Sequence, residues 1–105
     1  MIEIVTTYDL RHEMDYGAYL AFVNNAVERE RHAEGFLELR AHRSIVGSRQ
    51  VRVTHVWKSL ADWAKFVDSA ENRALDAELR SFVENVEMQI WGPSPVMPEP
   101  VRPSE

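Results

Sequence analysis

The sequence has 105 residues, a length typical of one domain, and 45% of them are hydrophobic, too many for a disordered chain. The net charge of -5, with acids and bases interspersed, argues against nucleic acid as a partner. The absence of cysteine excludes disulfides and thiolate catalysis. The sequence also has no signal-peptide pattern and no apolar run of membrane length, so we expect a cytoplasmic protein without membrane contact.

The N-terminal third predicts a strand followed by a helix. Residues 2–8 are short and β-branched, as in a strand, whereas residues 14–33 carry apolar side chains at helical spacing. Asp15 is the expected helix cap, and Gly35 ends the helix. The charged run at 28–31 is expected to be a solvated end of that helix.

The rest of the chain predicts a hairpin, a second helix and a last strand. Residues 36–46 and 50–57 alternate with period two. Their apolar faces coincide only if the connecting loop has an odd number of residues, which predicts a bulge or a three-residue loop. Ser59 is the natural cap of the second helix, and a break with a new cap is expected near Ser69. The last strand is expected at 85–91.

The resulting order, β-α-β-β-α-β, predicts an α+β, ferredoxin-like domain over residues 1–91. Its two helices would cover one face of a four-stranded antiparallel sheet. Residues 92–105 form a proline-rich tail that is expected to be extended or disordered. Alternatively, its first half is an arm that lies over a partner subunit, because Val96 and Met97 offer apolar anchors.

The second face of the predicted sheet mixes charged and apolar side chains. A monomer could leave this face wet, whereas a homodimer could bury it against its own copy. The expected dimer residues are Glu38, Arg40, His42, Arg52 and Trp91, within a face that also contains Glu3, Val5, Thr7, Thr54, Val56, Glu87 and Gln89.

Two tryptophans flank the corner between the 50–57 strand and the next helix. Trp57 and Trp63 are large enough either to fill a small core or to line a pocket for a flat aromatic ligand. His55 lies on the same strand face as Trp57 and is the candidate for proton transfer, the alternative being a hydrogen-bonded core histidine. Tyr16 and Tyr19 could donate hydrogen bonds to a substrate oxygen or simply place their hydroxyls in water.

Other kinds of site lack their sequence patterns. The four histidines, at 12, 32, 42 and 55, are not spaced as metal ligands, so no metal site is expected. Four scattered glycines cannot form a phosphate-binding loop, and no nucleophile elbow is present.

Two segments carry a resemblance to a known family. The corner VTHVWKSLADW (53–63) and the run SAENRALDAEL (69–79), within the β-α-β-β-α-β order, resemble the antibiotic biosynthesis monooxygenase family over residues 1 to about 91. The resemblance implies a homodimer whose sheets pack face to face into an α+β barrel, with a pocket between sheet and helices in each subunit. It implies oxidation of phenols or quinols by molecular oxygen without metal or flavin; a sister group degrades heme.

The resemblance also suggests roles for individual residues. In quinone-forming members a strand Trp, matched by Trp57, and a helix aromatic, matched by Trp63, line the pocket. Their substrate-binding Asn corresponds to Val53, and a pocket arginine would be Arg73 or Arg80. In heme-degrading members the iron-ligating His corresponds to Asp76. The first-strand Asn and the helix Trp of that group correspond to Thr6 or Thr7 and to Phe66, which makes Phe66 a further candidate for ligand contact.

The sequence therefore leaves three functions open. The first is a cofactor-independent monooxygenase acting on a small aromatic substrate, with His55 moving the proton. The second is a non-catalytic protein that binds a small hydrophobic ligand in the same pocket. The third is a dimeric regulatory module, which is less favoured because no DNA-binding segment accompanies it.

Overall fold

Strands and helices follow one another along the chain in the predicted order. The structure, a computed structural model, describes residues 1–104. Its elements are β1 (Ile2–Leu10), α1 (Tyr16–Arg31), β2 (Phe36–Arg43), β3 (Gln50–Trp57), α2 (Leu60–Val67), α3 (Ala70–Phe82) and β4 (Val83–Trp91). The α+β, ferredoxin-like fold is confirmed, with the second helix of that plan divided into α2 and α3.

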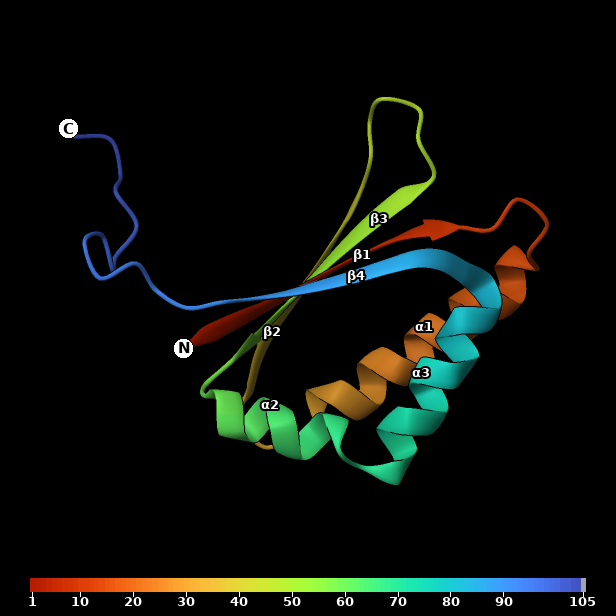
Figure 1. Ribbon diagram of the computed structural model, residues 1–105, viewed down its shortest axis with the longest axis horizontal. Helices are drawn as coiled ribbons and strands as arrows, with labels where there is room; N and C mark the ends of the chain where they lie inside the picture. The colour runs from red at the N-terminus through yellow and green to blue at the C-terminus, as the bar shows by residue number, and fades with distance from the viewer. Residues whose placement is uncertain (105) are drawn as a thin grey trace.

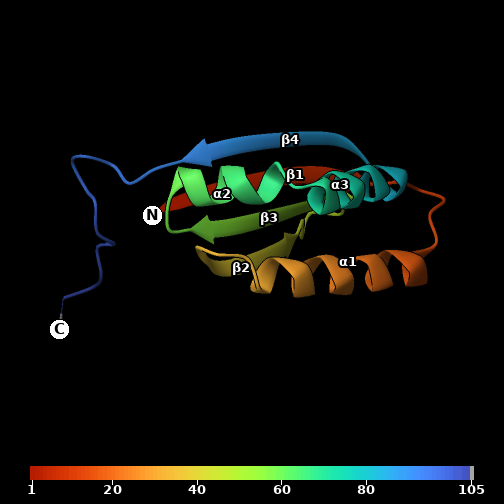
Figure 2. The same ribbon diagram turned by 90° about the horizontal axis from the view of Figure 1, so that it is seen from below.

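The four strands form one antiparallel sheet in the order β2-β3-β1-β4. Figure 1 shows the sheet nearly edge-on, with all three helices on one side of it. In Figure 2, α1 lies toward the β2 edge, whereas α2 and α3 lie in front of the middle of the sheet. One sheet face is therefore covered by helices, and the other is bare in a single chain.

The alternation of side chains assigns the two faces as predicted. Ile4 of β1 stands opposite His55 of β3, and Ile2 stands opposite Trp57, so these residues share a face. Ile4 and Trp57 are both buried beneath the helices. The hairpin connection consists of residues 45–49, because Ser44 N–H donates to Gln50 O at 3.0 Å. The loop is odd in length as predicted, but it is longer than the expected three residues.

The ends of β1 and β4 differ from the prediction because of a bulge. The register shifts between Thr7 and Asp9, after which Leu10 pairs with Val83, so β4 begins two residues before Asn85. Asn85 has a φ of 56°, and its amide donates to the Asp9 carboxylate at 3.0 Å. The left-handed backbone at Asn85 interrupts the period-two pattern, which is why the sequence placed the strand start there.

The helix caps were predicted correctly. The Asp15 carboxylate accepts from Ala18 N–H at 3.0 Å at the start of α1. Ser59 and Ser69 accept from Asp62 N–H and Asn72 N–H, both at 3.1 Å, and so begin α2 and α3. Each serine hydroxyl satisfies a backbone donor that the first helical turn leaves free.

Helix α1 buries only some of its apolar side chains. Tyr19 and Phe22 are buried, whereas Tyr16 and Leu20 are about half exposed. The main cluster consists of Tyr8, Leu10, Tyr19, Val51 and Val83, with Leu79, Phe82 and Val86 among the side chains around it. This cluster occupies the end of the domain near the bulge, while a separate aromatic cluster forms at the other end.

The segment after β4 has no helix or strand in the described part, 92–104. It extends away from the sheet and helices (Figure 1). Val96, Met97 and Val101 are mostly exposed, so within one chain these apolar side chains have nothing to cover them.

Candidate functional site

The aromatic cluster is built around Trp57, the last residue of β3. Trp57 is fully buried. Its ring lies 5.6 Å from that of Phe36 and 5.3 Å from that of Phe66 on α2, measured between centroids. Since Ser59 starts α2 directly after the strand, the cap fixes the turn that brings Phe66 onto Trp57. The ring is thus part of a core that the start of α2 closes.

Trp57 also carries a polar group without a partner. Among residues 1–104, its indole Nε1 is the one buried side-chain nitrogen or oxygen that forms no hydrogen bond. Buried donors are normally paired, and an unpaired one is costly. The indole N–H is therefore free to donate to a ligand oxygen or to a water molecule.

His55 contacts a carboxylate that the sequence assigned to solvent. Its Nδ1 faces the Glu30 carboxylate, and the two side chains are 24% and 8% exposed. The expectation that 28–31 is a solvated helix end is wrong at Glu30, which is buried, although Glu28, Arg29 and Arg31 are exposed. Glu30 is buried because it lies on the same inward-facing side of α1 as Tyr19 and Phe22.

A hollow of about 360 Å³ opens among the ends of the three helices. Its walls include Ala33, Phe66, Asn72 and Leu75, together with charged side chains. Two ion pairs between elements lie at this site: Arg29 with Glu71 at 2.7 Å and Lys65 with Glu34 at 3.4 Å.

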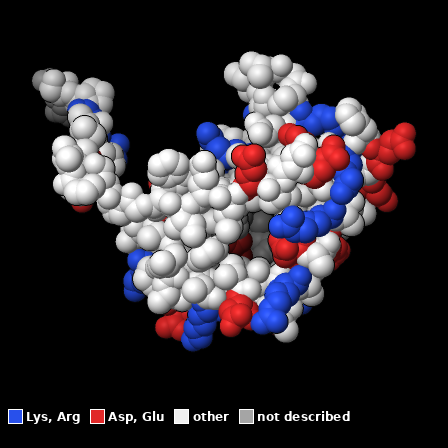
Figure 3. All heavy atoms as spheres, in the orientation of Figure 1, with Lys and Arg blue, Asp and Glu red and all other residues white. Residues whose placement is uncertain are grey.

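Phe66 connects this hollow to the aromatic cluster, since it both lines the hollow and packs against Trp57. His55 lies outside the lining. Figure 3 shows a hollow on the helix-bearing side, bordered by acidic and basic groups.

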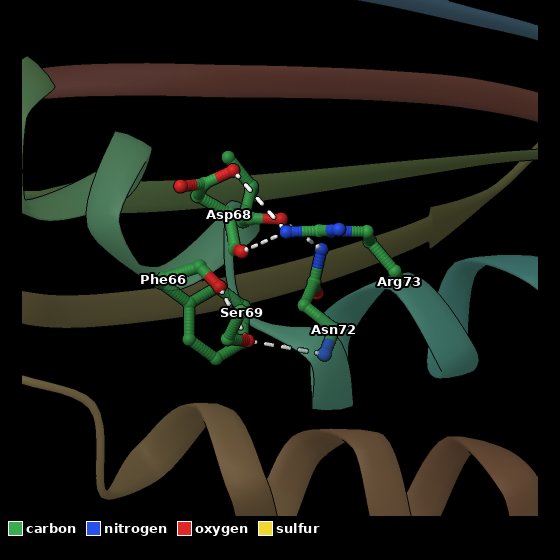
Figure 4. A network of polar contacts seen from close by, with 6 residues as sticks. Phe66, Asp68, Ser69, Asn72 and Arg73 are labelled. Carbon is green, nitrogen blue, oxygen red and sulfur yellow. Dashed lines mark hydrogen bonds and ion pairs between the residues drawn. The ribbon is translucent and has the colours of Figure 1, made fainter.

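The two candidate arginines are both on the surface and already bonded. Arg73 donates to the backbone oxygen of Asp68 at 2.6 Å and contacts its carboxylate at 3.4 Å. Figure 4 shows Arg73 and Asn72 arranged around the joint between α2 and α3, where Ser69 also bonds Phe66 O. Arg80 donates to Asp76 one helical turn away at 3.0 Å. The structure thus uses Arg73 to hold the helix joint.

The other candidate residues are dispersed. Tyr19 donates to or accepts from the hydroxyl of Tyr8 at 2.9 Å in the main core. Tyr16 is about half exposed, 6.0 Å from Tyr19 between ring centroids. Trp63 is partly buried on α2. The structure therefore brings together Trp57 and Phe66, places His55 two residues along the same strand face, and puts the tyrosines at the opposite end.

The bare sheet face is polar and slightly concave. A hollow of about 470 Å³ on it is lined by Glu3, Val5, Thr7, Arg40, His42, Arg52, Thr54, Gln89 and Trp91. Arg40 bridges Glu3 at 2.7 Å and Glu38 at 3.3 Å, so part of this charge is paired within the chain.

Within 1–104, no group of three or more histidine, cysteine or acidic side chains is arranged to hold a metal ion. In the same range, no helix is long and apolar enough to cross a membrane.

The sequence interpretation missed Glu30 and Asn72. The signal for Glu30 was its spacing of eleven, eight and four residues from Tyr19, Phe22 and Ala26, which continues an inward stripe. Asn72 was read as part of a motif; it supplies a helix-start N–H to Ser69 and an amide that donates to Val67 O at 3.4 Å.

Comparison with known proteins gives consistent results. The family model described as "Antibiotic biosynthesis monooxygenase" matches residues 1–78. A search among curated protein sequences finds no match.

Several solved structures are similar in fold. SnoaB, a cofactor-independent oxygenase from Streptomyces nogalater, superposes with a TM-score of 0.78 at 12% identity, covering 93% of this chain and 97% of SnoaB. Rv0793 from Mycobacterium tuberculosis gives 0.75 at 12% identity, with coverage of 89% and 94%. A conserved protein from Methanosarcina mazei gives 0.76 at 13% identity, with coverage of 86% and 89%. At these identities the likeness is one of fold.

Proposed function

Because the chain belongs to the antibiotic biosynthesis monooxygenase family, we propose that it oxidises a small aromatic phenol or quinol with molecular oxygen and without metal or flavin. The observation that carries this proposal is His55, oriented by the buried Glu30 and located two residues from Trp57 on the helix-facing side of the sheet. SnoaB, which shares the fold, is a cofactor-independent oxygenase.

In such a reaction the substrate itself supplies the electrons. A ring carbon that bears two hydrogens in the keto tautomer loses a proton, and the resulting anion gives one electron to oxygen. The two radicals combine into a peroxide anion, which takes the proton back from the base to give a hydroperoxide. The hydroperoxide then loses water and leaves a carbonyl. Overall, CH₂ and O₂ become C=O and H₂O, so the balance needs no further reductant. The protein must supply a base, a donor for developing negative charge and a dry aromatic slot.

The residues near Trp57 can fill these roles. His55 Nε2 would accept the proton, while Trp57, Phe66 and Trp63 would hold the ring. The unpaired Trp57 N–H would donate to the developing oxyanion. Arg73 and Arg80 remain weaker candidates, since both are bonded to aspartates at the surface.

The resemblance also indicates why His55 is the polar group to test. Quinone-forming members carry an Asn at the position of Val53, which lies on the same face of β3 as His55. In this chain that position is apolar, so His55 is the polar side chain of this face nearest to Trp57. The polar contact to the substrate would accordingly come from His55, two residues closer to Trp57 than the Asn position of the quinone-forming members.

The bare sheet face supports a second part of the proposal, a homodimer. Trp91 is about half exposed there beside Val5 and paired charges. A second copy packed on this face would cover these side chains and close the α+β barrel. The exposed apolar residues of the tail would then lie within reach of the partner.

The competing function is non-catalytic binding of a small hydrophobic ligand. The openness of the hollow beside Phe66 and the absence of His55 from its lining favour it. A binder would use the same rings without proton transfer.

The test is oxygen uptake by metal-stripped protein with dihydroxynaphthalenes, anthrones and hydroquinones. We expect turnover that falls about 10²–10⁴-fold in His55→Ala. Trp57→Phe, which lacks the indole N–H, should also lose turnover. His12→Ala is the control, because His12 is exposed in the loop before α1. Uptake no faster than the uncatalysed rate, with tryptophan fluorescence still quenched by the same compounds, would favour the binder.

A further inference from the structure

Glu30 is the one acidic side chain that is buried in the described chain. It lies in the last turn of α1, and the residue is 6% exposed. Burying a carboxylate away from water is costly unless a charge or several donors compensate. The buried Glu30 carboxylate therefore needs a partner that compensates for this cost.

The cations near Glu30 in sequence are engaged elsewhere. Arg29 reaches Glu71 on α3 at 2.7 Å, and Arg31 and His32 both contact Glu28, at 3.4 and 3.0 Å. Among the contacts between basic and acidic side chains of residues 1–104, the ring of His55 is the sole partner of the Glu30 carboxylate. The buried acid is thus dedicated to one imidazole.

The geometry sets the orientation of that imidazole. Nδ1 of His55 points at the carboxylate, so an Nδ1–H donor leaves Nε2 as a lone-pair acceptor at the far side of the ring. The cross-strand neighbours of His55 are Ile4 and Leu39, both apolar, so neither side chain offers Nε2 a hydrogen bond.

We propose that Glu30 is a positioning residue that fixes the ring and tautomer of His55, keeping Nε2 free to accept a proton from the substrate. This inference rests on the proposed function of His55. Glu30 itself touches no substrate, and it acts by holding the ring and by stabilising the imidazolium formed when the proton arrives. A carboxylate behind a histidine base serves both purposes.

The experiment compares Glu30→Leu with the wild-type protein. Removing one partner of a buried pair is destabilising where it leaves a charge unpaired, so urea unfolding of Glu30→Leu is measured first, and its function is compared at a temperature where the variant is folded. Glu30→Asp tests for partial rescue. Glu28→Leu is the matched control, because Glu28 lies on the same helix but is exposed.

Two readouts are needed. Nitrogen-15 NMR of the ring should show the Nδ1–H tautomer in the wild type and a change to Nε2–H in Glu30→Leu. Oxygen uptake should show kcat reduced about 10- to 100-fold with KM unchanged, and partial recovery in Glu30→Asp. Glu28→Leu should match the wild type in both.

The outcomes separate the two proposals. An Nε2–H tautomer in the wild type, or a tautomer change without loss of kcat, would overturn the role of Glu30. A tautomer change in a wild-type protein that consumes no oxygen with any substrate would instead contradict the proposed oxygenase, while the assignment of Glu30 as the group that fixes His55 would stand.

Discussion

The hydroxyl groups of Tyr8 and Tyr19 lie 2.9 Å apart and join the central strand β1 to helix α1 inside the main core. Both side chains are buried. Each buried hydroxyl therefore has the other as its hydrogen-bond partner. The sequence offers Tyr19 as a substrate donor, and the structure places its hydroxyl in this bond.

Burial, reinforced by the bond to Tyr19, raises the pKa of Tyr8 well above its ordinary value of 10.0. The folded protein thus holds this proton more tightly than the unfolded chain. Stability from this group is fully present below pH 10 and is lost as the pH rises above it. We expect the free energy of unfolding, measured with urea, to fall as the pH rises from about 10 to about 12, and to fall less in Tyr8→Phe.

At pH 8, Tyr8→Phe should cost about 1 kcal/mol, because the Tyr19 hydroxyl loses its partner. Tyr16→Phe is the control, since Tyr16 is about half exposed. Equal alkaline losses in the wild type and Tyr8→Phe would contradict this account.

Alanine substitutions at Gly35 and Gly47 distinguish the cost of backbone strain from the cost of a steric conflict. Both have a positive φ, 85° and 87°. A Cβ at Gly35 would collide with the Asp62 side chain, whereas a Cβ at Gly47 would meet nothing within 4 Å. We expect Gly47→Ala to lose about 1–2 kcal/mol of unfolding free energy from φ alone, and Gly35→Ala to lose more. Equal losses in denaturant titrations would show that Asp62 moves aside freely.

The Ser69 hydroxyl holds the joint between α2 and α3. It donates to Phe66 O at 2.8 Å and accepts from Asn72 N–H at 3.1 Å. We expect Ser69→Ala to lower the free energy of unfolding by about 1 kcal/mol. Ser81→Ala, in the exposed last turn of α3, should change it little. If both variants had the same stability, the cap would contribute nothing.

The proposed dimer predicts a charge-sensitive interface on the bare sheet face. Trp91→Glu would place a charge on this face that a partner subunit must desolvate. We expect sedimentation analysis to show the wild type at twice the 12.2 kDa chain mass and Trp91→Glu at the chain mass. Leu60→Glu, on the helix side, should remain dimeric. A wild type that sediments at the mass of one chain would refute the dimer.

The sequence predicted the faces of the sheet and the helix caps because both depend on local chemistry. Alternation along 50–57 is enough to align Val53, His55 and Trp57. Ser59 and Ser69 could be identified as caps because short hydroxyl side chains satisfy free helix N–H groups. Such features need no knowledge of the tertiary structure.

The predictions that failed depend on contacts between distant segments. Glu30 looked like one of four charged neighbours, and only the position of His55 on β3 gives it a buried partner. The start of β4 was misplaced because the bulge at Asn85 depends on Asp9, 76 positions away. The contact of Arg73 with Asp68, at the joint between two helices, was likewise not visible in the sequence.

The central position of β1 has a consequence for synthesis on the ribosome. β1 is the first strand to emerge, yet its edge pairs with β4, whose residue Ile90 stands opposite Ile4. Until residues 83–91 leave the exit tunnel, that edge is open to other chains. The nascent domain therefore cannot complete its sheet stepwise, and its window of exposure to aggregation or chaperones lasts until β4 has emerged.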